Sequence, residues 1–240
     1  MSGQKYAIGI DLGTTHSALS WVDLQAEGVA PEILSIAQQS GPGAVQDFAL
    51  LPSFLYLPNA SEFAAGDLAL PWNAAPERIT GEWARSHGAL TPIRLVSSAK
   101  SWLGHAGVDR RAGILPADAP AEVERISPLA ASTHYLQHLR DAWNHRHPDA
   151  PFDQQAVTVT IPASFDPAAR ELTAEAAQAA GYQSITLLEE PQAALYSWIA
   201  GSAGDWRKQV QVGDVILVID VGGGTSDFSL IAVTEDAGNL

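Results

Sequence analysis

Two short apolar runs, one near each end of the chain, share the same pattern of hydrophobic and polar positions. In the first, residues 6–10 are apolar, Asp11 ends the run, and a Gly-Thr-Thr turn leads into renewed strand-like spacing. This pattern predicts a buried strand, a tight turn and a returning strand. In the second, residues 215–219 are apolar, Asp220 ends the run, and a glycine-rich turn precedes a strand over residues 226–233. We interpret the two predicted hairpins as an internal duplication.

The first turn carries groups that suit a phosphate ligand. Gly13 allows backbone N–H groups to approach a ligand closely, and Thr14 and Thr15 add hydroxyl donors. Asp11 has the wrong charge to touch a phosphate, so its presence requires a cation between the two, and Mg²⁺ with its water shell is the usual one. Two facing hairpins of this kind would hold a nucleotide phosphate chain between two lobes.

Strands and helices alternate in the second half of the chain. Residues 156–161 and 184–188 have the composition of strands, and each is followed by a helical pattern. The first helix is predicted to have Asp166 as its N-cap and to stop at Gly181, and Pro191 opens the second. This order of strand, helix, strand and helix predicts α/β architecture.

Other segments give shorter elements. Residues 31–37 and 51–58 are each expected to form one short strand, and residues 104–128 to be mostly loop. A helix is expected from Ser127 to Trp143. Four histidines at or near this helix are interpreted as a solvated helix face rather than a metal site, because no acidic or cysteine partner joins them. They are His134, His138, His145 and His147.

Composition narrows the possible classes of function. The 240 residues include no cysteine and carry a net charge of −14. The absence of cysteine excludes disulfides and thiol catalysis and fits a reducing compartment. The negative charge repels nucleic acid and anionic membranes. No apolar run approaches membrane-spanning length, Asp11 interrupts the first one, and no P-loop pattern is present. We therefore expect a cytoplasmic protein that binds neither nucleic acid nor a membrane.

Two segments give a specific resemblance to a known family. Residues 8–17 (IGIDLGTTHS) and 220–227 (DVGGGTSD) resemble the two phosphate motifs of the actin-like ATPases, most closely those of the DnaK-type, seventy-kilodalton heat-shock chaperones. Residues 99–104 (AKSWLG) and the run from Pro162 to Pro191 are also similar to this family. The resemblance implies an actin-like ATPase (ribonuclease H-like) α/β fold, comprising the first lobe and the start of the second.

The resemblance also implies a division of the chain. Residues 1–45 and 130–205 would form the core of the first lobe, residues 46–129 an inserted smaller subdomain, and residues 206–240 the incomplete start of the second lobe. Since the family's adenosine-binding motif and peptide-binding domain are missing, we expect a fragment that binds nucleotide weakly and is inactive alone. The hairpin at 215–233 would have unpaired strand edges, which favour pairing with a second copy.

By resemblance, the activity would be hydrolysis of ATP with Mg²⁺, and K⁺ is a further candidate ion. The implied metal-binding residues are Asp11, Glu190 and Asp220. The implied catalytic residues are Lys100, Glu190, Asp220 and Thr225. The implied residues that bind ATP or ADP are Gly13, Thr14, Thr15, His16, Gly222, Gly223, Gly224 and Thr225. In a longer protein, the nucleotide state would control a peptide-binding domain, so unfolded client peptides and co-chaperones are the implied partners.

Some positions depart from the family pattern. His16 stands where relatives commonly have Asn or Tyr, and Glu189 where they often have Asn; the adjacent acids Glu189 and Glu190 are expected to raise one another's pKa. Residues 71–95 do not align with the pattern. Two other functions remain open: a sugar kinase of the same superfamily, against which the segments around Lys100 and Glu190 argue, and a non-catalytic actin-like scaffold.

Overall fold

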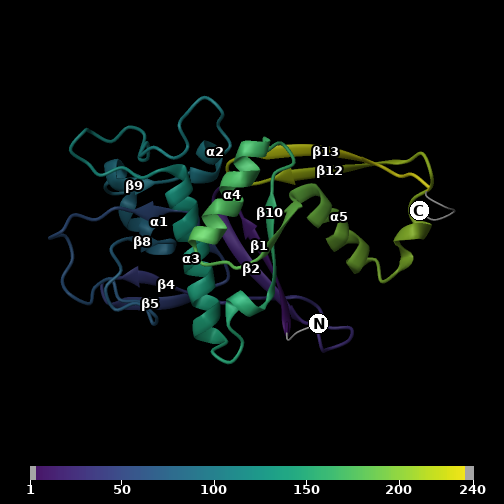
Figure 1. Ribbon diagram of the computed structural model, residues 1–240, viewed down its shortest axis with the longest axis horizontal. Coiled ribbons are helices and arrows are strands. Elements are labelled where there is room, and N and C mark those ends of the chain that lie inside the picture. The colour runs from purple at the N-terminus through teal and green to yellow at the C-terminus, as the bar shows by residue number, and fades with distance from the viewer. Residues whose placement is uncertain (1–3, 236–240) are drawn as a thin grey trace.

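The strand β1 lies at the centre of a mixed sheet in the computed structural model, which describes residues 4–235 (Figure 1). The order of the sheet is β11-β10-β1-β2-β3, and β6 also pairs with β2. β10 is parallel to β1 and β11 is parallel to β10, whereas β2 returns antiparallel to β1. The strands are β1 (Tyr6–Leu12), β2 (His16–Asp23), β3 (Glu32–Ile33), β6 (Leu51–Pro52), β10 (Ala156–Ile161) and β11 (Ile185–Glu189).

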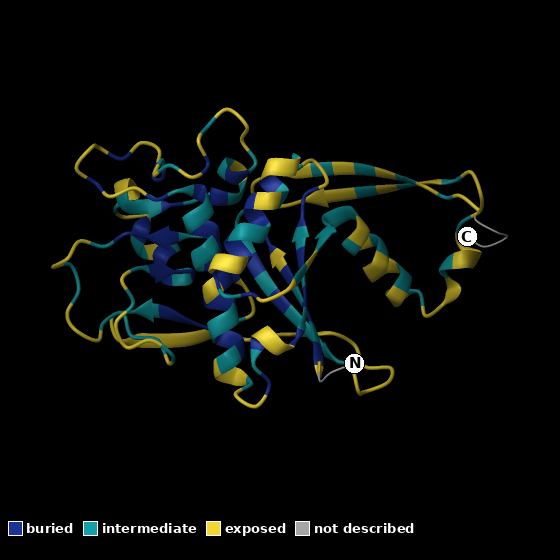
Figure 2. Ribbon diagram, viewed as in Figure 1, coloured by how far each residue is buried: buried dark blue, intermediate teal, exposed yellow. Residues whose placement is uncertain are grey.

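Two helices, α3 (Pro128–Arg146) and α4 (Pro167–Ala179), pack against each other and lie across the sheet in Figure 1. Alternate residues of β1 are buried in the core beneath them, which appears as dark blue segments in Figure 2. Trp143 of α3 is fully buried, its ring centroid is 5.4 Å from that of Tyr6, and its indole N–H donates to the Ala150 carbonyl. The apolar run near the N-terminus thus forms the middle of the core.

The helix ends follow the predicted capping residues. The Ser127 hydroxyl accepts a hydrogen bond from the Ala130 N–H at the start of α3. The Asp166 carboxylate likewise accepts from the Ala169 N–H at the start of α4. Gly181 has a φ of +89°, the left-handed conformation that ends a helix. These predicted boundaries are confirmed, and the next helix, α5 (Glu190–Gly201), begins one residue before the proline that predicted it.

Two predicted single strands are wrong, since each is divided between different sheets. Residues 31–37 contribute β3 to the main sheet and then the start of β4 (Ile36–Gly41), which pairs with β5 (Ala44–Phe48). Residues 51–58 contribute β6 and then β7 (Leu55–Tyr56), which pairs with two other short strands. The break follows Pro52, where the Ser53 N–H bonds instead to the Thr15 carbonyl of the first turn.

The region between β7 and α3 contains short elements. β7 lies between β8 (Ile79–Thr80) and β9 (Leu95–Val96) in a small sheet. The helices are α1 (Glu82–Gly88), η1 (Pro92–Arg94) and α2 (Ala99–Leu103). Residues 104–128 are mostly loop, as predicted. Within this loop, Leu115 and Ile126 form an isolated antiparallel β-bridge.

The interpretation of the histidines as a solvated helix face is wrong for His138. Its side chain is 5% exposed, and its Nε2 donates to the Ala37 carbonyl at 2.9 Å. The ring of Trp72 packs edge-on against it, with centroids 5.2 Å apart. Burial lowers the pKa of His138 to about 4 and that of the neighbouring His134 to about 4 as well. The segment around Trp72 therefore covers a helix face that the helical pattern alone left in solvent.

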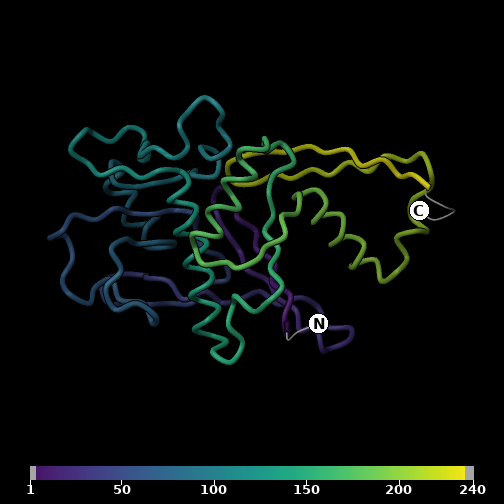
Figure 3. The backbone as a smooth tube through the Cα atoms, in the orientation of Figure 1, coloured from purple at the N-terminus to yellow at the C-terminus, as the bar shows by residue number. Residues whose placement is uncertain are grey.

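The second predicted hairpin forms a two-stranded sheet of its own. β12 (Val215–Val221) and β13 (Ser226–Ala232) are antiparallel, with Asp220 opposite Asp227. The chain reaches them through α5 and the short helix η3 (Asp205–Lys208), and the hairpin extends beyond the central sheet at the yellow end of the trace in Figure 3. Both predicted hairpins are confirmed. The remaining short helix is η2 (Phe152–Gln154).

Candidate functional site

The two turns of the predicted hairpins touch each other. A Cβ atom added at Gly223 would lie 2.6 Å from the Thr15 Oγ1, and one added at Gly224 would lie 2.9 Å from the Thr14 Cγ2. Real Cβ atoms do not approach other atoms this closely, so only glycine allows the second turn to approach the two threonines. Residues about 210 positions apart in the chain thus form one surface that is rich in N–H and hydroxyl donors.

The first turn is fixed by its own backbone and by Ser53. A Cβ atom at Gly13 would lie 2.0 Å from the His16 carbonyl oxygen, so this position requires glycine. The Ser53 hydroxyl donates to the Gly13 carbonyl at 2.8 Å, and the Ser53 N–H donates to the Thr15 carbonyl at 2.9 Å. In the second turn, the Gly222 N–H donates to the Thr225 carbonyl at 2.9 Å. The carbonyl groups of Gly13, Thr15 and Thr225 therefore each accept a hydrogen bond from within the protein.

Asp11 and Asp220 occupy equivalent places, each near the end of the first strand of its hairpin. Asp11 lies opposite Thr160 in the neighbouring strand, whose hydroxyl donates to its Oδ1 at 3.3 Å. Both aspartates are exposed. Their carboxylates are therefore accessible to an ion held near the two turns.

Lys100 of α2 and Glu190 of α5 form an ion pair beside the aspartates. The Lys100 Nζ lies 2.5 Å from the Glu190 Oε1, and their side chains are only 12% and 15% exposed. Burial raises the pKa of Glu190, and Asp11 and Asp220 raise it further, while Lys100 lowers it. Glu190 therefore lies within the electrostatic field of both aspartates, and the structure groups four charged residues from separate parts of the chain.

Glu189 does not act on Glu190 in the way that the sequence suggested. The Glu189 carboxylate pairs with Arg170 of α4. The acidic groups that raise the pKa of Glu190 are Asp11 and Asp220 instead. Sequence adjacency was misleading because Glu189 is the last residue of β11 whereas Glu190 is the first residue of α5, and the two carboxylates have different partners.

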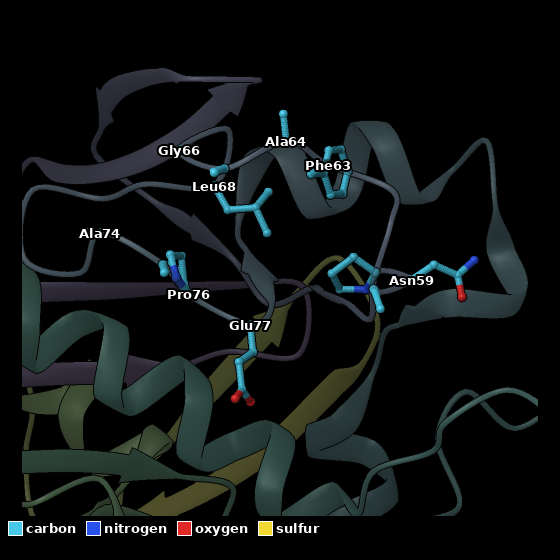
Figure 4. Close-up of a pocket in the computed structure, with 12 residues that line it drawn as sticks. Asn59, Phe63, Ala64, Gly66, Leu68, Ala74, Pro76 and Glu77 are labelled. Carbon is cyan, nitrogen blue, oxygen red and sulfur yellow. The ribbon is translucent and has the colours of Figure 1, made fainter.

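A cavity of about 310 Å³ opens beside this group. Its lining includes Glu190, Asp220 and Asp227, together with Ser164 and Phe228. A second cavity of about 310 Å³, lined by Phe63, Leu68 and Pro76 among others, is formed by residues 58–77 and includes none of the residues named above (Figure 4). Of these two cavities, the first is therefore the one that includes charged residues of the candidate site.

The donor set fits a hydrated metal ion better than a directly bound one. Within residues 4–235, no group of three or more histidine or acidic side chains is arranged to hold a metal ion. Mg²⁺ commonly keeps several waters and uses only one or two carboxylates. Asp11 and Asp220, accessible and close to a surface of N–H and hydroxyl donors, meet that requirement.

Sequence reasoning missed two residues at this site. Ser53 holds the first turn through two hydrogen bonds, and Arg85 of α1 approaches the ring of His16, with its Nη1 3.3 Å from the His16 Nε2. Arg85 lies in residues 71–95, which matched no motif. A short polar residue next to Pro52 at the break of a strand was the available signal for Ser53.

The sequence of this chain is similar to those of known chaperones. A family model described as Hsp70 protein matches residues 72–239, so it includes most of the segment 71–95 that the motif pattern had left unaligned. The chain is 30% identical to a chaperone protein HscA homolog of Bordetella petrii, 31% identical to one of Methylococcus capsulatus, and 32% identical to the chaperone protein HscA of Edwardsiella ictaluri. Each alignment covers 97% of this chain and 33% of the relative, so the chain spans about a third of the length of these relatives.

Among residues 4–235, each helix is too short or too polar to span a bilayer.

Proposed function

Because the chain belongs to the Hsp70 family, we propose that it is the part of an ATP-hydrolysing chaperone that binds the nucleotide phosphates. The observation that carries this proposal is the contact between the two turns, Gly223 and Gly224 against Thr14 and Thr15. The two turns both present glycine N–H groups and threonine hydroxyls, each beside one aspartate, and they would bind one phosphate chain from two sides. The family supports a chaperone rather than a sugar kinase or a scaffold. Its actin-like fold is consistent with the mixed sheet and its covering helices.

The residues of the two turns would bind the phosphates. Backbone N–H groups at Gly13 and at residues 223–225, together with the hydroxyls of Thr14, Thr15 and Thr225, would donate to phosphate oxygens. The N–H of Gly222 already donates to the Thr225 carbonyl, so Gly222 would contribute by shaping the turn. Asp11 and Asp220 would hold the water shell of Mg²⁺, and the bound ion would neutralise phosphate charge. K⁺ remains a candidate second ion. The net charge of −14 makes such local neutralisation necessary.

Lys100 and Glu190 would act on the reacting groups. In phosphoryl transfer, catalysis depends mainly on positioning and on electrostatic stabilisation. Lys100 would stabilise charge on the terminal phosphate and help to place the attacking water. Glu190 would orient that water, and its raised pKa brings its proton affinity closer to neutral pH, where an acid or base works best.

The wider role is proposed from the family alone. In a protein of the length of the relatives, the nucleotide state at this site would control binding of unfolded client peptides elsewhere in the chain, assisted by co-chaperones. A cytoplasmic location stays a prediction from the absence of cysteine.

Titration of the 240-residue chain with Mg·ATP tests the proposed site. We expect weak but saturable binding, with a Kd above about 10 µM, because this chain supplies the phosphate turns without the rest of the relatives' length. Gly223→Ala should weaken binding further, since its new Cβ would displace Thr15. Gly41→Ala is the matched control, because nothing lies within 4 Å of its new Cβ. Absence of binding at millimolar nucleotide would contradict the proposed function, and a Kd of about 1 µM or lower would contradict the expected weak binding and show that this part of the chain suffices.

We also propose that the second hairpin pairs with a second copy of this chain. One face of β12–β13 consists of apolar side chains that are between 52% and 73% exposed. They include the cross-strand pairs Leu217–Leu230 and Ile219–Phe228. Among the described residues the sheet has two strands, so both outer edges lack a partner strand. An exposed apolar face with open edges favours pairing with an identical one.

Light scattering over a range of protein concentrations tests this self-association. We expect a concentration-dependent dimer that Phe228→Glu prevents, because the charge would be buried in the paired face. Leu90→Glu is the control, since Leu90 is 81% exposed on another part of the molecule. A monomer at all concentrations would contradict this proposal.

A further inference from the structure

A chain of four polar side chains links α1 to the first turn. Arg85 pairs with Glu82 one turn earlier in α1, with its Nη2 2.7 Å from the Glu82 Oε2. The Arg85 Nη1 lies 3.3 Å from the His16 Nε2. On the other side of the ring, the His16 Nδ1 lies 3.2 Å from the Thr15 Oγ1. The series therefore ends on a hydroxyl that faces the second turn.

The chemistry of these groups fixes the direction of each hydrogen bond. A guanidinium has N–H donors and no acceptor, so the His16 Nε2 must accept from Arg85. Burial lowers the pKa of His16, and the charge of Arg85 lowers it further against the opposing effect of Glu82. The ring is therefore neutral near pH 7 and carries one proton. Since the Nε2 accepts, that proton lies on the Nδ1.

The position of this proton decides what the Thr15 hydroxyl can do. The Nδ1–H donates to the Thr15 Oγ1, which therefore acts as an acceptor in this hydrogen bond. Its own O–H hydrogen is left for another acceptor, and within residues 4–235 the hydroxyl makes no second hydrogen bond. The Thr15 Oγ1 also lies at the contact with Gly223. The hydrogen is thus available to an acceptor placed between the two turns.

We propose that Arg85 is a positioning residue that holds His16 as its Nδ1–H tautomer, and that His16 in turn orients the Thr15 hydroxyl to donate to a phosphate oxygen. This inference rests on the proposed function for the identity of the acceptor. In the other tautomer the Nε2–H would point at an N–H donor of Arg85, and the two donors could not form a hydrogen bond. The unprotonated Nδ1 would then accept the hydroxyl hydrogen of Thr15, so that this hydrogen could not be donated to the ligand.

Nitrogen NMR of the His16 ring in the 240-residue chain tests the tautomer without any ligand. At about pH 7.5 we expect the Nδ1–H form. Arg85→Met, which keeps the length of the side chain but removes its donors, should shift the ring toward the Nε2–H form, and Arg85→Lys should restore the original tautomer. Arg111→Met is the control, because Arg111 pairs with Glu175 away from the turns. An Nε2–H ring in the unmodified chain would overturn the inference.

Titration with Mg·ADP then tests the link to phosphate. Arg85→Met should weaken binding about 2- to 10-fold, the usual effect of one hydrogen bond. In a His16→Asn background it should have no further effect, because the shorter amide can donate to Thr15 but does not reach Arg85. An equal loss in both backgrounds would show that Arg85 acts directly, and would overturn the inference. No binding by the unmodified chain, with the Nδ1–H tautomer present, would instead overturn the proposed function.

Discussion

Acidification from about pH 6.5 to about pH 4 is expected to destabilise the folded chain through His134 and His138. Burial lowers the pKa of both histidines to about 4. The charge of Arg78 lowers the pKa of His134 further, whereas Glu77 raises it. The hydrogen bond to the Ala37 carbonyl and the charge of Asp141 both raise the pKa of His138, but burial outweighs them. In the unfolded chain each has an ordinary pKa of about 6.5. The unfolded state therefore binds more protons in this interval, and the free energy of unfolding falls by up to about 1.4 kcal/mol per pH unit for each histidine.

Urea denaturation at a series of pH values measures this effect. The stability that the two neutral histidines contribute to the free energy of unfolding is fully present above about pH 6.5, and it is lost as the pH falls to about 4. His138→Gln should reduce the slope in this interval, although it also removes a buried hydrogen bond to Ala37 and so lowers stability at neutral pH. His105→Gln is the control, because His105 is exposed. A flat profile between pH 6.5 and 4 would show that these rings are accessible to protons in the folded state.

Replacement of Lys100 by alanine is expected to raise the pKa of Glu190 further above its ordinary value. Lys100 is the positive charge that opposes burial, Asp11 and Asp220 in setting this pKa. Without it, the ionised Glu190 would face two aspartates in a largely buried position. In a chain long enough to hydrolyse ATP, loss of this charge should also lower the turnover about 10²- to 10³-fold, the usual cost of removing one group that stabilises the transition state.

Carbon NMR of the Glu190 carboxyl group as a function of pH measures the first effect directly. Lys100→Arg keeps the positive charge and should keep the pKa of Glu190 close to its original value, so it separates charge from packing. An unchanged pKa in Lys100→Ala would mean that the ion pair seen at 2.5 Å does not persist in solution.

Local signals in the sequence were sufficient for the elements that carry the site. The two apolar runs that end in Asp11 and Asp220 predicted both hairpins, because a strand and a glycine turn are specified by neighbouring residues. Ser127 and Asp166 predicted the helix starts for the same reason, since a capping side chain bonds within its own first turn.

Features that depend on distant contacts were not predictable in this way. The division of residues 51–58 depends on a bond from Ser53 to Thr15, and the burial of His138 depends on Trp72. The same holds for Arg85, which reaches the first turn only because α1 packs near it. None of these contacts leaves a periodic pattern, because each joins segments that are at least 35 residues apart.

The two aspartates are anchored to very different degrees. β1 is hydrogen-bonded on both sides, to β2 and β10, so Asp11 can be displaced only if the central sheet is disrupted. Within residues 4–235, β12 is hydrogen-bonded only to β13, so Asp220 can shift with a unit of two strands that leaves the core intact. Local opening costs less free energy where fewer buried contacts are lost. A rearrangement that separates the two turns would therefore move the second turn while the first keeps its place as the fixed reference of the site.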